Sequence, residues 1–212
     1  MRLASLTPAI MLRAYAAGVF PMAESADDPE LFWVDPPVRG ILPVGGVHAS
    51  RSLLRSLRRD GWSATLDRDF AAVVDACADR RETWINAPLR AVYVELHARG
   101  FAHSFEVWRD GALAGGVFGI ALGAAFFGES MFSARSGGSK LALLWLSRQL
   151  AAGGFRLFDT QFLTPHLASL GGREIPRAEY QSRLAAALSL PAVLSPELPD
   201  AEALWQETTQ TS

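Results

Sequence analysis

The order of hydrophobic periodicities after residue 102 constrains the fold of this chain more than any other feature. Three segments alternate with the two-residue period of strands, at His103–Arg109, Ala112–Leu122 and Ala124–Phe132. A helical segment over Ser139–Ala152 and a fourth strand over Phe155–Gln161 follow. Because an Asp-Gly pair, which is a tight-turn signal, separates the first two strands, we expect an antiparallel meander with one helical crossover. The sequence therefore predicts an α+β fold.

The ends of the chain differ from this central block. Thr7 and Ser50 are N-cap residues that predict helices, and the stretch Phe20–Pro37 is rich in turn residues. The residues after Leu190 are rich in Pro, Glu and Thr. We therefore expect a small N-terminal α/β domain over residues 1–62, a domain with a mostly antiparallel sheet flanked by helices over residues 63–190, and a loosely ordered tail over residues 191–212.

Composition limits the class of protein. The net charge of −2 and the pI of about 6.1 exclude a globally basic nucleic-acid binder. The single cysteine, Cys77, rules out an internal disulfide and fits a reducing compartment. No metal-spaced His/Cys cluster, signal peptide or apolar run of about 20 residues is found. We expect a cytoplasmic enzyme or binding domain with no metal and no membrane span.

Two short blocks place a carboxylate inside an apolar stretch, one on each side of the crossover helix. The first holds Glu129 and the second holds Asp159 with Gln161. A buried carboxylate is costly unless it has a partner or a task. Glu129 is either a strand-end carboxylate bound to backbone amides or an anionic anchor for a cationic substrate group. In a regular strand it shares a face with Phe127 and Met131, an alternation that a bulge would change.

Asp159 and Gln161 lie two residues apart, so a regular strand places both side chains on one face. There the carboxylate would fix the NH2 group of Gln161 and aim the amide oxygen at a proton donor. The alternative is a satisfied strand end before a helix capped by Thr164. His166 could be a ligand or a base, but a lone histidine near a helix start is usually structural.

Two further segments suggest contacts with anions. Arg51, Arg55, Arg58 and Arg59 form a stripe on one helix with no acid between them, which either binds phosphates or is simply a solvated face. Residues 136–140, Ser-Gly-Gly-Ser-Lys, lead into the crossover helix but lack the glycine spacing of a phosphate loop. A phosphate or ribose contact and a plain helix entry both remain open there.

Motifs in order along nearly the whole chain resemble one family. They occupy residues 14–15, 18–21, 48–52, 83–85, 103–108, 115–119, 128–133, 139–140, 159–161, 168–171 and 174–177. In this pattern the chain resembles the bacterial leucyl/phenylalanyl-tRNA–protein transferases. The resemblance implies a GNAT-like C-terminal domain and a small N-terminal domain. It also implies an aminoacyltransferase of the N-degron pathway, which moves Leu, Phe and, less well, Met from aminoacyl-tRNA to an N-terminal Arg or Lys. The transfer would mark the acceptor protein for degradation, and the resemblance implies no cofactor.

The resemblance also assigns roles to residues. Gln161 would orient or deprotonate the acceptor amine, Asp159 would polarise Gln161, and Glu129 would anchor a positively charged part of the substrates. Trp84 would lie near the tRNA 3′ adenosine, Met22 stands where the family usually has a second tryptophan, and the arginine stripe would bind the acceptor stem. An apolar slot for the aminoacyl side chain would be lined by Val117, Phe126, Ser130, Met131, Leu143 and Phe158.

Two departures from the family and two rival functions follow. The N-terminal extension is short, and Phe158 is larger than the aliphatic residue usual there, which predicts a tighter slot and poorer transfer of Phe. A coenzyme A-dependent N-acyltransferase on the same fold is one rival. A non-catalytic tRNA-binding module, which would be indifferent to Gln161→Ala, is the other. Nothing in the sequence demands more than a monomer.

Overall fold

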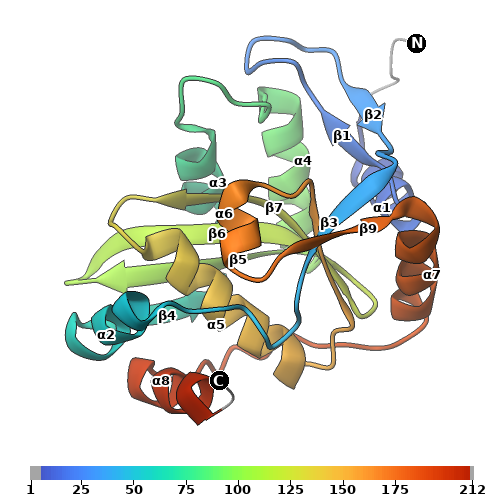
Figure 1. Ribbon diagram of the computed structural model, residues 1–212. Coiled ribbons are helices and arrows are strands. Elements are labelled where there is room, and N and C mark those ends of the chain that lie inside the picture. Colours follow the sequence, from blue (N-terminus) through green and yellow to red (C-terminus); the bar gives the residue numbers. More distant parts are fainter. Residues whose placement is uncertain (1–5, 211–212) are drawn as a thin grey trace.

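A seven-stranded sheet forms the centre of the molecule (Figure 1). The structure is a computed structural model, and it describes residues 6–210. Every neighbouring pair of strands in the sheet is antiparallel except β7 and β8. The strands lie in the order β4 (Trp62–Leu66), β5 (Ala102–Arg109), β6 (Ala112–Leu122), β7 (Ala125–Ser133), β8 (Leu157–Gln161), β3 (Val38–Leu42) and β9 (Arg173–Pro176). The prediction of an α+β fold with an antiparallel meander is confirmed.

Helices cover both faces of this sheet. Their bounds are α1 (Pro8–Ala16), α2 (Arg51–Arg59), α3 (Phe70–Ala78), α4 (Ala87–Ala98), α5 (Gly138–Ala152), α6 (Pro165–Ser169), α7 (Arg177–Leu188) and α8 (Ala201–Gln210). Side chains of α1, α3, α4 and α7 share one core cluster with Phe118 and Phe127 of the sheet. Side chains of α2, α5 and α8 share a second cluster with Phe105 and Phe126. The α5 crossover thus lies on the opposite face of the sheet from α3 and α4.

Side-chain caps explain where several helices begin. The hydroxyl oxygens of Thr7, Ser50 and Thr164 accept hydrogen bonds from backbone amides of α1, α2 and α6 at 3.2–3.3 Å. Asn86 caps α4 in the same way, with its amide oxygen 2.9 Å from the backbone nitrogen of Leu89. These residues satisfy backbone donors that a helix start leaves unpaired. The two starts predicted at Thr7 and Ser50 are confirmed.

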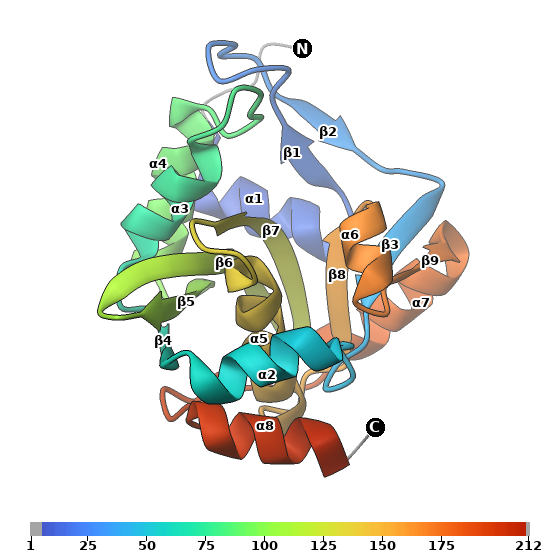
Figure 2. The ribbon, with the colours of Figure 1, turned by 60° about the vertical axis from the view of Figure 1, so that its left-hand side comes forward.

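The parallel pair at the centre of the sheet is short. β7 and β8 pair only from Ala125–Phe127 to Leu157–Asp159. Beyond this stretch β7 stays with β6 and bends away from β8 (Figure 2). Glu129 on β7 and Gln161 on β8 lie beyond the paired stretch, where the two strands diverge, whereas Asp159 is still paired with Phe127.

The C-terminal segment corrects one prediction. The expected loosely ordered tail over residues 191–212 is wrong for residues 201–210, because these form α8. Leu204 is fully buried, and the Trp145 indole donates a hydrogen bond to the carbonyl oxygen of Pro199 at 2.8 Å. Figure 2 shows α8 beside α2, where the Arg58 guanidinium lies 5.1 Å from the ring centre of Trp205. Residues 211–212 lie outside the described part of the chain.

Two short pairings were not predicted. The turn-rich stretch from residue 20 to residue 37 contains the antiparallel hairpin of β1 (Phe20–Met22) and β2 (Phe32–Val34). Strand β9 pairs with β3 at the edge of the sheet. Because β3 lies between β8 and β9, residues 1–62 contribute a strand to the central sheet.

The domain division at residue 62 and the GNAT-like character of the larger domain stay predictions. No helix within residues 6–210 has both the length and the apolar character needed to cross a bilayer.

Candidate functional site

Glu129 lies at a β-bulge in β7, just beyond the stretch that pairs with β8. Phe118 of β6 pairs with Ser130, and Gly119 pairs with Gly128, so Glu129 has no partner residue in β6. A bulge of this kind re-aims side chains and reverses the alternation beyond it. The predicted shared face of Phe127, Glu129 and Met131 is therefore wrong, since Phe127 packs in the first core cluster and Met131 against the second.

Glu129 is held by side chains rather than by backbone amides. Its carboxylate accepts hydrogen bonds from the hydroxyl of Tyr15 at 2.7 Å and the hydroxyl of Tyr93 at 2.6 Å. The amide Nε2 of Gln161 donates a third, at 3.2 Å. α1, α4 and β8 each supply one of these donors. The interpretation of Glu129 as a carboxylate bound to backbone amides is wrong.

This environment changes how Glu129 titrates. Burial raises the pKa of its carboxyl group to about 7, although the hydrogen bonds from Tyr93 and Tyr15 lower it. Burial and the nearby Glu129 raise the pKa of both tyrosines well above the ordinary value, so the hydroxyls remain donors at neutral pH. A carboxyl group poised near neutrality inside a cavity is typical of functional sites.

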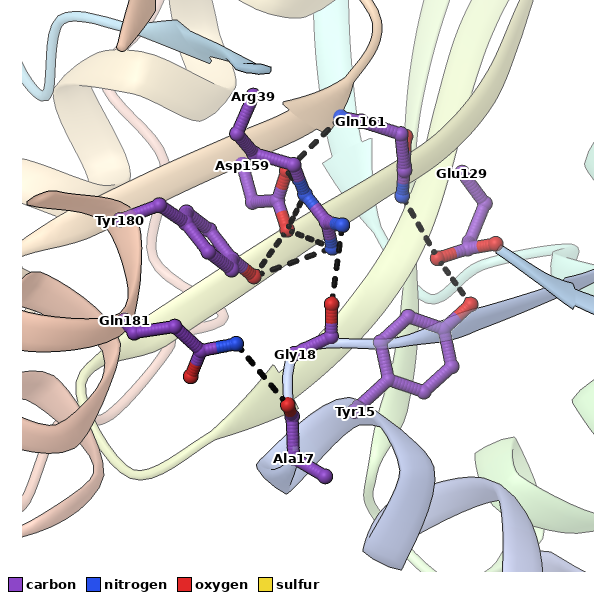
Figure 3. A network of polar contacts seen from close by, with 9 residues as sticks. All are labelled: Tyr15, Ala17, Gly18, Arg39, Glu129, Asp159, Gln161, Tyr180 and Gln181. Carbon is purple, nitrogen blue, oxygen red and sulfur yellow. Dashed lines mark hydrogen bonds and ion pairs between the residues drawn. The ribbon is translucent and has the colours of Figure 1, made fainter. Parts of the chain in front are cut away.

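Asp159 is fully buried, and its contacts connect to those of Glu129 through Gln161 (Figure 3). Its carboxylate accepts hydrogen bonds from Nε and Nη2 of Arg39 at 2.8–3.1 Å. It accepts another from the hydroxyl of Tyr180 at 2.7 Å. Arg39 also donates from Nη1 to the carbonyl oxygen of Gly18 at 3.0 Å. Its guanidinium lies 4.6 Å from the ring centre of Phe20 and 4.4 Å from that of Tyr180. The network ties β3, β8, α7 and the loop after α1 together.

The predicted relay from Asp159 to the side chain of Gln161 is wrong. One residue, Gly40, pairs with Gln161 and the next, Ile41, pairs with Asp159, so β8 has an extra residue at Thr160. Gln161 also has a φ of 59°, in the left-handed region. The Asp159 carboxylate therefore accepts from the backbone N–H of Gln161 at 2.8 Å, while the Gln161 side chain turns to Glu129 (Figure 3).

A cavity of about 300 Å³ opens beside Glu129 and Gln161. Its wall is mostly apolar and includes Met22 and Trp84, the two residues predicted near the tRNA 3′ end. Further lining residues are Phe20, Pro21, Arg80, Val117, Gly128, Ser130, Met131, Leu143, Phe158, Thr160, Phe162, Thr164 and Leu167. A mostly apolar cavity with a few polar groups at one end is the usual form of a small-molecule site.

Five of the six residues predicted for the apolar slot line this cavity, and Phe126 does not. Phe126 is fully buried behind the wall, with its ring centre 5.6 Å from that of Phe158 in an edge-to-face contact. It therefore does not contribute to the cavity wall, although it belongs to the same core cluster as the wall residues Val117, Leu143 and Phe158.

Two family models match this chain. The family model described as leucyl/phenylalanyl-tRNA protein transferase matches residues 41–185, and the model of that family's N-terminal domain matches residues 4–37. The chain belongs to this family.

Relatives named leucyl/phenylalanyl-tRNA–protein transferase match nearly the whole chain. The protein of Ruegeria sp. (strain TM1040) is 61% identical over 209 residues, which covers 98% of this chain and 100% of the relative. That of Paracoccus denitrificans (strain Pd 1222) is 61% identical over 208 residues and 98% of each chain. That of Jannaschia sp. (strain CCS1) is 63% identical over 187 residues and 88% of each chain.

The arginine stripe of this transferase-family chain lies on α2. Arg51, Arg55, Arg58 and Arg59 are all exposed, as a phosphate-binding face requires. Arg58 differs from the others because its guanidinium packs on Trp205 of α8. The assignment of this stripe to the acceptor stem stays a prediction.

The start of α5 offers fewer free amides than its sequence suggests. The backbone N–H of Gly138 donates to the carbonyl oxygen of Arg135 at 2.9 Å, and that of Ser139 to the hydroxyl of Ser133 at 3.2 Å. A Cβ atom on Gly138 would lie 2.3 Å from the carbonyl oxygen of Ala114. This glycine is therefore explained by close packing of α5 on β6, which favours the plain helix entry.

His166 does not line the cavity, although Thr164 and Leu167 do. Burial and the nearby Lys140 lower the pKa of its imidazole. Within residues 6–210, its buried Nε2 atom makes no hydrogen bond, and no cluster of three or more His, Cys, Asp or Glu side chains could hold a metal ion.

Several site residues were missed from the sequence. Arg39 had a usable signal, because it is the only charged residue in the apolar strand Val38–Leu42. Tyr15 had a weaker one, as part of the pair at residues 14–15 that matches the family motif. Tyr93 and Arg80 had none, since a tyrosine on an amphipathic helix and an arginine after a helix end are both ordinary surface or core residues.

Proposed function

We propose that this chain transfers leucine or phenylalanine from an aminoacyl-tRNA to the N-terminal amino group of an acceptor protein. The observation that carries the proposal is the apolar cavity that ends at the hydrogen-bonded pair Glu129 and Gln161. Relatives at about 60% identity bear the corresponding name. The cavity suits an aliphatic or aromatic side chain, and the polar end suits the reacting ester and amine.

The reaction does not require a covalent intermediate with the protein. The donor is an ester that is already activated, so the acceptor nitrogen attacks its carbonyl carbon, a C–N bond forms and the C–O bond to the tRNA ribose breaks. The proton lost by the nitrogen goes to the leaving ribose oxygen. An α-amino group has a pKa near 8, so a neutral amine is available and needs mainly to be held at the carbonyl.

Gln161 is the group we assign to hold that amine. Its Nε2 is engaged by Glu129, so the amide orientation is fixed. Within the described residues, the Oε1 atom of Gln161 makes no hydrogen bond to the protein, which leaves it to accept one from the amine. Asp159 acts through the backbone, because it fixes the strained turn at Gln161 and does not line the cavity.

Glu129 gives the polar end of the cavity a negative charge above neutral pH. This charge suits acceptors with an N-terminal Arg or Lys, whose first residue carries two positive charges when the amine is protonated. Trp84 and Met22 would contact the terminal adenosine of the tRNA, and the α2 arginines its phosphates. We expect the chain to work as a monomer.

The test is transfer of labelled leucine from Leu-tRNA to a peptide that begins with Arg. Gln161→Ala should lower the rate by about a hundredfold at unchanged thermal stability, because the amine loses its positioning partner. Gln206→Ala, the same change at an exposed site on α8, should keep the wild-type rate. Transfer from acetyl-CoA without tRNA, or a Gln161→Ala variant as active as wild type, would contradict the proposal.

A further inference from the structure

One cation lines the cavity, and neither the family assignment nor the proposed mechanism gives it a task. Among the described residues that form the wall, Arg80 is the only lysine or arginine. It follows the end of α3, is exposed, and shares the wall with Trp84. An exposed arginine on an open surface is ordinary, but this one lines a mostly apolar cavity in which Glu129 is the only other charged residue among those described.

Three hydrogen bonds hold the guanidinium of Arg80 in place. Nε donates to the carbonyl oxygen of Cys77 at 2.8 Å. Nη2 donates to the hydroxyl of Ser130 and to the carbonyl oxygen of Met131, both at 3.0 Å. The side chain therefore bridges the end of α3 to β7 just beyond the bulge. Little rotamer freedom is left for a ligand to remove, which favours binding.

The third nitrogen of the same group is available. Within residues 6–210, no protein atom accepts a hydrogen bond from Nη1 of Arg80. Because Arg80 lines the cavity, the N–H groups of Nη1 are free to donate to a ligand bound there. No carboxylate forms an ion pair with this arginine in the described part of the chain. A fixed guanidinium with a free N–H edge is suited to an anionic oxygen, above all that of a phosphate or a carboxylate.

We propose that Arg80 binds the phosphate that links the terminal adenosine of the donor tRNA to the preceding nucleotide. This inference rests on the proposed function. The donor is the substrate with an anion next to the group that enters the cavity, since its phosphate adjoins the nucleoside expected at Trp84. The acceptor brings a positively charged first residue, which Arg80 would repel and Glu129 attracts. Arg80 would therefore favour the donor, and Glu129 the acceptor, at their respective parts of the cavity wall.

The inference predicts a dependence on donor size. Three donors would be compared with wild type and Arg80→Ala: Leu-tRNA, the leucyl ester of cytidylyl-adenosine, which keeps the single phosphate, and leucyl-adenosine, which has none. Arg80→Ala should raise KM for the first two donors roughly tenfold to a hundredfold, as expected for loss of a hydrogen bond between charged groups. KM for leucyl-adenosine should change less than about twofold, within the usual scatter of surface substitutions.

Controls separate a contact from a structural role. Arg80→Lys keeps a charge and should restore part of the loss with the two phosphate-bearing donors. Arg99→Ala, an exposed arginine at the far end of α4, should change nothing. An equal rise in KM for all three donors would show that Arg80 has only a structural role in the cavity wall. A rise confined to the KM of the acceptor peptide would show that Arg80 contacts the acceptor. Either result overturns the inference, as does no change at all. Failure of wild type with every donor would instead reject the proposed function.

Discussion

At the scale of single residues, the site depends on which carboxylate faces the cavity. Glu129 does so and is shared by two tyrosines and Gln161, whereas Asp159 is buried against Arg39 and touches Gln161 only at the backbone. The two acids look equivalent in the sequence. Their different partners give them different tasks, one at the reacting groups and one in holding the turn that carries Gln161.

Glu129 should make folding stability depend on pH in a defined window. Its pKa is raised from an ordinary 4.5 to about 7 in the folded protein. Between these values the folded state binds a proton that the unfolded chain has released, so the contribution of Glu129 to stability falls as pH rises. Glu129→Gln cannot titrate. The melting temperature of this variant, relative to wild type, should therefore rise from pH 4.5 to 7 and stay level above pH 7.

The matched control for this series is Glu202→Gln, because Glu202 is exposed on α8. Its melting temperature should follow that of wild type at every pH. A constant difference between Glu129→Gln and wild type across the window would show that the folded protein does not raise the pKa of Glu129.

At the scale of elements, Arg39 connects β3 to β8, α7 and the loop after α1. Arg39 lies on β3 and forms an ion pair with Asp159 of β8. Its guanidinium packs on the ring of Tyr180 in α7 and donates a hydrogen bond to the carbonyl oxygen of Gly18, after α1. Among these elements, β8 carries Phe158, Thr160 and Gln161, which line the cavity. Two bulges, at Glu129 on β7 and at Thr160 on β8, then turn the polar residues of neighbouring strands toward each other.

Arg39→Met should destabilise the protein strongly. The change keeps much of the side-chain volume but leaves the Asp159 carboxylate buried without a cation, which typically costs about 3–5 kcal/mol. The free energy of unfolding from urea titration at neutral pH measures this loss. Combining Arg39→Met with Asp159→Asn removes the unpaired charge and should recover part of it. A loss below about 1 kcal/mol for the single variant, the level of an exposed ion pair, would contradict this role.

At the scale of the whole molecule, the sequence predicted the order of strands and helices after residue 102 because each segment has a clear period. That success covers the segments from residue 102 to residue 161, and the sequence did not predict the hairpin of β1 and β2, strand β9 or helix α8. These are short or lie in composition typical of loops, and they form through tertiary contacts such as those of Leu204 and Trp205.

The site was predicted in its residues more than in its geometry. Glu129, Gln161, Trp84, Met22 and most of the slot do line one cavity. The relay from Asp159 was wrong because strict alternation was assumed for a strand that contains a bulge. Phe126 was placed in the slot by the family resemblance, and it lies behind the cavity wall. A bulge inserts a single residue and has no strong sequence signal, so only the paired strands reveal it.

The central claim is that the cavity walled by Phe158 receives the side chain carried by the donor tRNA. The most direct test is the ratio of kcat/KM for Leu-tRNA over Phe-tRNA, measured with wild type and Phe158→Ile. A smaller residue in the wall gives the larger ring more room, so the ratio should fall, by up to roughly tenfold, since hydrophobic pockets discriminate modestly. A ratio that is the same in both proteins, at equal thermal stability, would contradict the account.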